Sequence, residues 1–103
     1  MARLRYSAEA NDDLASIAAY IADRSGDRRI AERFADELRR RCRDIAAASI
    51  RVGRARAELR SDLRSIPHKN YLIFFRYVAD TVEIVNVIEG HRDIAAIFRN
   101  DEQ

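Results

Sequence analysis

The segment Tyr71–Val78 is the strongest constraint on how this chain folds. Apart from Arg76, all of its residues are aromatic or aliphatic, so both faces of an extended strand would be apolar. Such a strand lies inside a sheet with both faces covered, because apolar surface is driven out of water. A turn at Ala79–Asp80 leads to a second β-branched run, Val82–Ile88. We therefore predict a central hairpin of two strands.

Two helices are predicted before this hairpin. Ser7 is a suitable N-cap for the first helix, which Ser25-Gly26 ends, and Asp27 can cap the second. Apolar residues recur at helical spacing in both, at Ala10, Leu14, Ile17, Ala18 and Ile21 and at Ile30, Phe34, Leu38, Cys42 and Ile45. Because the break between the helices is short, we expect an antiparallel helical hairpin.

The remaining segments complete one domain, residues 1–103. Arg3–Tyr6 alternates polar and apolar residues, as in a half-buried strand. Arg51–Glu58 has the composition of a loop, Leu63–Ile66 predicts a short strand, and Ile94–Phe98 predicts a terminal helix. The fold class is therefore α+β: an N-terminal strand, then the antiparallel helical hairpin packed on a mainly antiparallel four-stranded sheet, then a short C-terminal helix.

The basic residues are concentrated in one region. From Arg51 to Lys69 there are six bases and two acids, so the segment carries 6 − 2 = +4. The whole chain carries +2, which leaves +2 − 4 = −2 for the rest. Local positive charge attracts phosphate or acidic surfaces. A solvated connector is an equally good interpretation of the same charges.

Several function classes are disfavoured by composition. One cysteine, Cys42, and two separated histidines, with no glycine-rich phosphate loop, predict no cofactor and no metal. Apolar runs such as Tyr71–Phe75 are too short for a membrane span. The first residues carry charges where a signal peptide needs apolar ones, so we expect a cytoplasmic protein.

Motifs along most of the chain resemble one known family. They are Ser7, Asp13-Leu14, Ile17, Tyr20-Ile21-Ala22, Gly53-Arg54, Glu58-Leu59, Leu63-Arg64-Ser65, Tyr71–Arg76, Val82–Val87 and Gly90–Ile94. In order and spacing, from Leu4 to Phe98, the chain resembles a ParE-type toxin of the RelE/ParE superfamily. The resemblance implies the toxin component of a type II toxin-antitoxin system, which a ParD-like antitoxin neutralises in a hetero-oligomer.

The family contains two activities. RelE-like members are ribosome-dependent ribonucleases that cleave messenger RNA, and ParE-like members are thought to act on DNA gyrase. In the RelE pattern, basic side chains and a C-terminal tyrosine supply the chemistry. Here Leu72 stands where a basic residue is expected, Arg92 is retained, and Phe98 replaces the tyrosine. The comparison favours a gyrase inhibitor that acts by binding and is not an enzyme.

Two alternatives stay open. A RelE-like mRNA interferase would use His91 as general base and Arg92 for the phosphate. The other interpretation of His91 is a surface residue that caps the last strand. The second alternative is a non-toxic module that serves in complex formation.

The resemblance also suggests contact residues. Those expected to bind the target are Arg54, Arg64, Arg76, Arg92 and Phe98. Those expected to bind the antitoxin are Tyr20, Ala31 and Ala35. Arg76 is expected either to pair with Glu83 or Glu89 or to join the other arginines on a concave face, because a charge in an apolar strand needs a partner. The aromatic residues of its strand are interpreted as core rather than as a platform for stacking bases.

Overall fold

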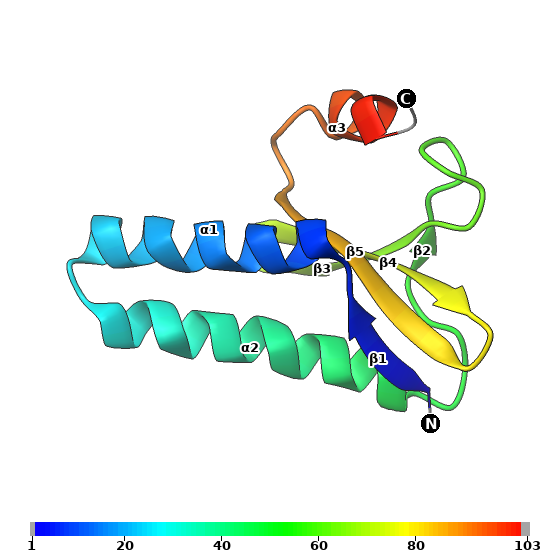
Figure 1. Ribbon diagram of the computed structural model, residues 1–103, viewed down its shortest axis with the longest axis horizontal. Helices are drawn as coiled ribbons and strands as arrows, with labels where there is room; N and C mark the ends of the chain where they lie inside the picture. Colours follow the sequence, from blue (N-terminus) through cyan, green and yellow to red (C-terminus); the bar gives the residue numbers. More distant parts are fainter. Residues whose placement is uncertain (1, 102–103) are drawn as a thin grey trace.

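The computed structural model describes residues 2–101, with side chains for residues 2–99. The elements are β1 (Arg3–Tyr6), α1 (Ala8–Ser25), α2 (Arg28–Ala47), β2 (Arg54–Ala55), β3 (Arg64–His68), β4 (Tyr71–Val78), β5 (Thr81–Glu89) and α3 (Ile94–Asp101). Five strands form one sheet in the order β1-β5-β4-β3-β2, with β1 parallel to β5 and the other pairs antiparallel. The predicted α+β class is confirmed (Figure 1).

The sheet has one strand more than the sequence predicts. The additional strand, β2, falls in the segment expected to be a loop and pairs Arg54 with Ser65 and Ala55 with Arg64. Two residues are too few to show an alternating pattern. The strand depends on a tertiary contact, since Arg64 holds the backbone that leads into it.

The predicted helix ends are confirmed. The Ser7 hydroxyl accepts a hydrogen bond from the backbone N–H of Ala10 at 2.9 Å, and Asp27 accepts one from Arg29 at 2.8 Å. Gly26 ends α1 with φ at +70°, the left-handed region that glycine enters easily. Local capping therefore fixes both helices and the sharp reversal between them.

α1 completes the hydrogen bonding of β5 beyond the end of β1. The two strands pair only as far as Tyr6 and Ile84. Ser7 then donates its N–H to the Ile84 carbonyl at 2.9 Å and its hydroxyl to the Val85 carbonyl at 2.7 Å. The start of α1 thus covers a strand edge that would otherwise be open.

The helical hairpin covers one face of the sheet. Ile73 and Phe75 on β4 point toward the helices, where they pack with Leu38 of α2 and are fully buried. Cys42 is also fully buried there, and burial raises its pKa to about 11, so the thiol stays protonated. We call this side the helix-covered face.

The opposite side carries a smaller apolar cluster. Phe74 points away from the helices and meets Phe98 of α3, with ring centroids 5.0 Å apart. Figure 1 shows α3 standing apart from α1 and α2. We call this side the second face; its apolar floor consists of Leu63, Phe74, Val85 and Ile88. The aromatic residues of β4 thus belong to the core, on both sides of the sheet.

No helix in the described residues has the length and apolar character needed to cross a membrane.

Candidate functional site

A row of charged side chains crosses the second face from β1 to the loop of residues 56–63. Arg5 on β1 and Arg76 on β4 both donate to Glu83 on β5, with nitrogen–oxygen distances of 3.1 and 2.7 Å. Arg76 also donates to Asp62 of the loop at 3.2 Å. The charges alternate in sign, so they are compensated within the protein.

The pKa values reflect this compensation. Burial alone would raise the pKa of Glu83, but the hydrogen bond and charge of Arg76, with help from Arg5, lower it. Hydrogen bonds to Glu83 and Asp62 raise the pKa of Arg76. Of the two glutamates suggested as its partner, Glu83 is therefore the one that holds Arg76.

Two arginines of the loop, Arg56 and Arg60, stack on the aromatic rings below them. The guanidinium carbon lies 5.5 Å from the Phe74 centroid for Arg56 and 5.3 Å from the Phe98 centroid for Arg60. Arg56 Nε also donates to Glu58 at 2.8 Å. Arg60 Nε is buried and has no hydrogen-bond partner among the described residues. Arg56 Nη1 also donates to Ser65 Oγ at 3.1 Å. The Nε of Arg56 is thus occupied, whereas that of Arg60 is not.

Asn86 and Asp13 join β5 to α1. Asn86 is 5% exposed and donates its Nδ2 to Asp13 Oδ2 at 3.1 Å, and the Val87 N–H donates to the same oxygen at 2.9 Å. Burial raises the pKa of Asp13, although these two hydrogen bonds act in the opposite direction. The Oδ1 of Asn86 is buried and, within the described part of the chain, unpaired.

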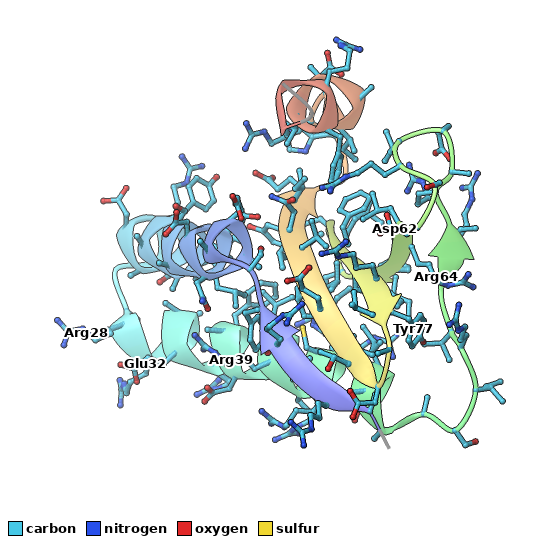
Figure 2. The ribbon with its side chains drawn as sticks, turned by 45° about the vertical axis from the view of Figure 1, so that its right-hand side comes forward. Arg28, Glu32, Arg39, Asp62, Arg64 and Tyr77 are labelled. Carbon is cyan, nitrogen blue, oxygen red and sulfur yellow. The ribbon has the colours of Figure 1, made fainter. Side chains whose placement is uncertain are left out.

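Arg64 holds the segment that precedes β2. Its Nε and Nη2 donate to the carbonyls of Val52 and Gly53, both at 2.8 Å. The Tyr77 hydroxyl accepts the N–H of Val52 at 3.0 Å, and the Arg51 guanidinium lies 4.9 Å from the Tyr77 ring centroid. Figure 2 shows Arg64 and Tyr77 on the right-hand side of the view, near β2. Arg64 and Tyr77 thus hold the loop that leads into β2.

The four arginines expected to bind the target lie in separate environments. Arg54 is exposed on the edge strand β2, Arg64 holds the loop, and Arg76 sits in the charged row. Arg92 is exposed after β5 and lines a cleft of about 190 Å³ beside Tyr20. They therefore do not form a single patch.

Phe98, also expected at the target interface, is buried. It is 1% exposed and packs edge-on against Phe74. Leu72 is half-buried and packs against the same cluster. The Phe98 ring thus anchors α3 to the second face and leaves little surface for a partner.

The three residues expected to contact the antitoxin divide into two kinds. Tyr20 is 53% exposed, whereas Ala31 and Ala35 are 3% and 9% exposed and lie in the packed interior of the hairpin. Small residues at helical spacing let two helices approach closely, which explains their burial. Ile30, which is 44% exposed, is a further apolar residue on the hairpin surface.

His91 and Arg92 do not form an assembled acid–base site. The His91 side chain is 76% exposed, and its Nδ1 lies 3.6 Å from Glu89 Oε2. His68, at the end of β3, is not part of this pair; its Nε2 lies 3.5 Å from Oε2 of Glu37 on α2. Within the described part of the chain, no three histidine, cysteine or acidic side chains come close enough to hold a metal ion.

Sequence reasoning missed Arg56, Arg60 and Asn86 as members of the site. One signal was available: Asn86 is the only uncharged polar residue in Val82–Ile88. Arg56 and Arg60 gave no such signal, since their positions above Phe74 and Phe98 depend on the path of the loop.

These features define a class of protein: a small α+β domain with a helical hairpin on one face of its sheet and arginines on the other. A solved structure described as the chromosomal ParDE TA system from P. aeruginosa has the same fold, with a TM-score of 0.75. The match covers 86% of this chain and 96% of that chain at 14% identity.

The family follows from the sequence. The model of one protein family, described as the ParE toxin of the type II toxin-antitoxin system parDE, matches residues 4–94 of this chain. The chain therefore belongs to the ParE toxin family, as its motifs suggested. No curated protein matches the sequence.

Proposed function

We propose that this toxin acts by binding DNA gyrase, and that a ParD-like antitoxin holds it inactive in the bacterial cytoplasm. The observation that carries the proposal is the packing of Leu72 and Phe98 in the apolar cluster under α3. In the RelE pattern these positions supply a basic group and a tyrosine for RNA cleavage. General acid–base catalysis needs groups that exchange protons, and neither side chain has one.

The charge on the second face supports the same conclusion. RNA cleavage needs positive charge that is free to stabilise a phosphorane. Arg76, the arginine in the middle of the sheet, already donates to Glu83 and Asp62. Its charge is compensated before any substrate arrives.

The mRNA interferase alternative rests on His91 and Arg92. A general base must be oriented toward the proton that it removes. His91 is largely exposed and has only a distant contact with Glu89. His91 and Arg92 therefore support RNA cleavage less well than the second face supports binding of a partner.

We further propose that the antitoxin lays an extended segment and an amphipathic helix over the helical hairpin and the adjacent sheet edge. Tyr20 and Ile30 are large apolar residues exposed on that hairpin, and Tyr20 also lines a cleft together with Tyr71 and Arg92. Exposed apolar residues next to a cleft are typical of grooves that take a peptide helix.

The test of the target runs two purified reactions side by side. We expect the toxin to stop supercoiling by gyrase and to leave mRNA on programmed ribosomes intact. Cleavage of mRNA in the ribosomal A site that is lost in a folded His91→Ala variant would make the toxin a ribonuclease. No effect in either reaction from a folded protein would favour the non-toxic module.

The antitoxin contact has its own test. Tyr20→Ala should weaken binding of the antitoxin encoded beside this gene about tenfold, because truncating an aromatic anchor costs more than about 1 kcal/mol. The matched control is Ile50→Ala, since Ile50 is 72% exposed but lies outside the hairpin. Equal affinities for the two variants would contradict the proposed contact.

A further inference from the structure

A polar pocket of about 300 Å³ lies on the second face, where α1 begins. Its lining includes two guanidinium groups, from Arg60 and Arg76, two carboxylates, from Glu9 and Glu83, and the amide of Asn86. The two positive and two negative charges sum to zero. The pocket therefore has no net charge with which to attract an anion.

Two residues that line the pocket each have a buried atom with no hydrogen-bond partner among the residues that the structure describes. One is a donor, the Nε–H of Arg60, and the other is an acceptor, Oδ1 of Asn86. Buried polar groups in native proteins are nearly always paired, because leaving them unpaired costs free energy. Asn86 is also held in place, since its Nδ2 is fixed by Asp13. A ligand that accepts at Arg60 and donates at Asn86 would satisfy both atoms.

We propose that this pocket binds a carboxamide group of a protein partner. Its carbonyl oxygen would accept from Arg60 Nε, and its N–H would donate to Asn86 Oδ1. A carboxylate lacks the donor, and a phosphate brings charge that the neutral pocket does not compensate. The group comes either from an asparagine or glutamine side chain or from a peptide bond.

A nucleobase also offers an acceptor and a donor, but the pocket does not suit it. Bases bind proteins largely by stacking on aromatic rings. In the described residues, no aromatic side chain lines the pocket, and the nearby Phe98 ring is already covered by Arg60. The amide is the better match.

The test is a nuclear magnetic resonance titration of the whole, isotope-labelled protein. Acetamide presents its acceptor and donor side by side, as a side-chain amide does, and N-methylacetamide presents them on opposite sides, as a peptide bond does. We expect one of the two to move the Arg60 Nε–H and Asn86 Nδ2 resonances saturably. Acetate, inorganic phosphate and cytidine should leave these resonances in place.

Arg60→Lys and Arg56→Lys form a matched pair of variants. Both keep the charge, and both remove an Nε–H from an arginine stacked on a phenylalanine. Arg60→Lys should weaken amide binding about tenfold or more, by loss of one charged hydrogen bond. Arg56→Lys should leave it unchanged, because Arg56 Nε is engaged by Glu58. Thermal unfolding of both variants checks the fold.

Four outcomes would overturn the inference: no saturable shift with either amide, as for a pocket that holds only water; equal shifts with acetate or phosphate; a shift with cytidine alone; or equal losses in the two variants.

The inference goes beyond the proposed function, because it concerns the chemistry of the ligand and not the identity of the target. A toxin that spares gyrase would refute the proposed function and leave the titration unchanged.

Discussion

The helix-covered face and the second face of the sheet are built differently. On the helix-covered face, two long capped helices bury Ile73 and Phe75 completely. On the second face, one short helix and a loop cover Phe74, and arginines stack on the Phe74 and Phe98 rings. The first is an apolar interior, and the second is a polar surface with an apolar floor.

This difference assigns most of the folding stability to the helix-covered face and ligand binding to the second face. Each Å² of apolar surface removed from water contributes about 25 cal/mol, so the larger apolar interior supplies most of the stability. The second face contains a buried donor and a buried acceptor without partners, Arg60 Nε and Asn86 Oδ1, in the part of the chain that the structure describes. Such groups cost stability in the free protein, and a ligand that paired with them would recover that cost. Four predictions about stability test this division, beginning with the largest effect.

Phe75→Ala should lower the free energy of unfolding by about 3–5 kcal/mol, as expected for removing a buried phenylalanine from a packed core. Phe75 is fully buried under the helices. Urea denaturation measures the loss. The control is Val78→Ala. Val78 is 36% exposed at the end of the same strand, so its truncation should lower the free energy of unfolding much less. Similar losses for both variants would contradict the assignment of stability to the helix-covered face.

Gly53→Ala should cost about 2–5 kcal/mol. Gly53 has φ at +83°, and an added Cβ would lie 2.8 Å from Phe75 Cζ and 3.0 Å from the Ser65 carbonyl oxygen. The left-handed backbone contributes about 1–2 kcal/mol and the overpacking about 1–3 kcal/mol. Gly26→Ala isolates the first contribution, because Gly26 has φ at +70° and nothing within 4 Å. Equal shifts in Tm for the two variants would show that the close contact with Phe75 carries no cost.

Phe98→Ala should cost less than half as much as Phe75→Ala, although both rings are buried to a similar degree. α3 is short and can detach on its own, which limits the cost to local opening. Hydrogen exchange should become faster in α3 and stay unchanged in α1. Cooperative loss of α1 together with α3 would mean that the two faces form a single unit.

The smallest effects concern pH, and they should have opposite signs. The raised pKa of Asp13 means that the folded protein holds this proton more tightly than the unfolded chain does. Its contribution to stability should therefore fall as pH rises above its ordinary pKa of 3.8. The lowered pKa of Glu83 means the reverse, so its contribution should be lost as pH falls below its ordinary pKa of 4.5. The free energy of unfolding of Asp13→Asn and of Glu83→Gln, each subtracted from that of the wild type between about pH 3 and 6, gives the slope with pH for each carboxyl group. Slopes of the same sign would contradict the assignment.

Most of the fold could be predicted from local patterns. The apolar pattern of Tyr71–Val78, the caps Ser7 and Asp27 and the stop at Gly26 each act within a few residues, so the sequence displays them directly. The two-residue strand β2 could not be predicted, because it depends on the contact between Arg64 and a distant carbonyl. The parallel pairing of β1 with β5 is likewise set by long-range packing.

The site was less predictable than the fold. Arg76 was expected to need a partner, and Glu83 supplies it. Ala31 and Ala35 were placed on the surface because alanine fits either a surface or a close helix contact. The pairing of Arg60 with Phe98 depends on where α3 packs against the 56–63 loop. Local sequence reveals which side chains are charged and leaves open which of them meet.

The most direct test of the division between the two faces is the toxin concentration that halves supercoiling by gyrase. Arg60→Glu reverses a charge on the second face, and Arg39→Glu reverses one on the helical hairpin, where Figure 2 shows Arg39 on α2. Each variant changes the net charge by the same amount. We predict that Arg60→Glu raises the required concentration about tenfold or more, through loss of a charged hydrogen bond, and that Arg39→Glu leaves it unchanged. Full potency in a folded Arg60→Glu variant, or an equal loss in Arg39→Glu, would contradict the account.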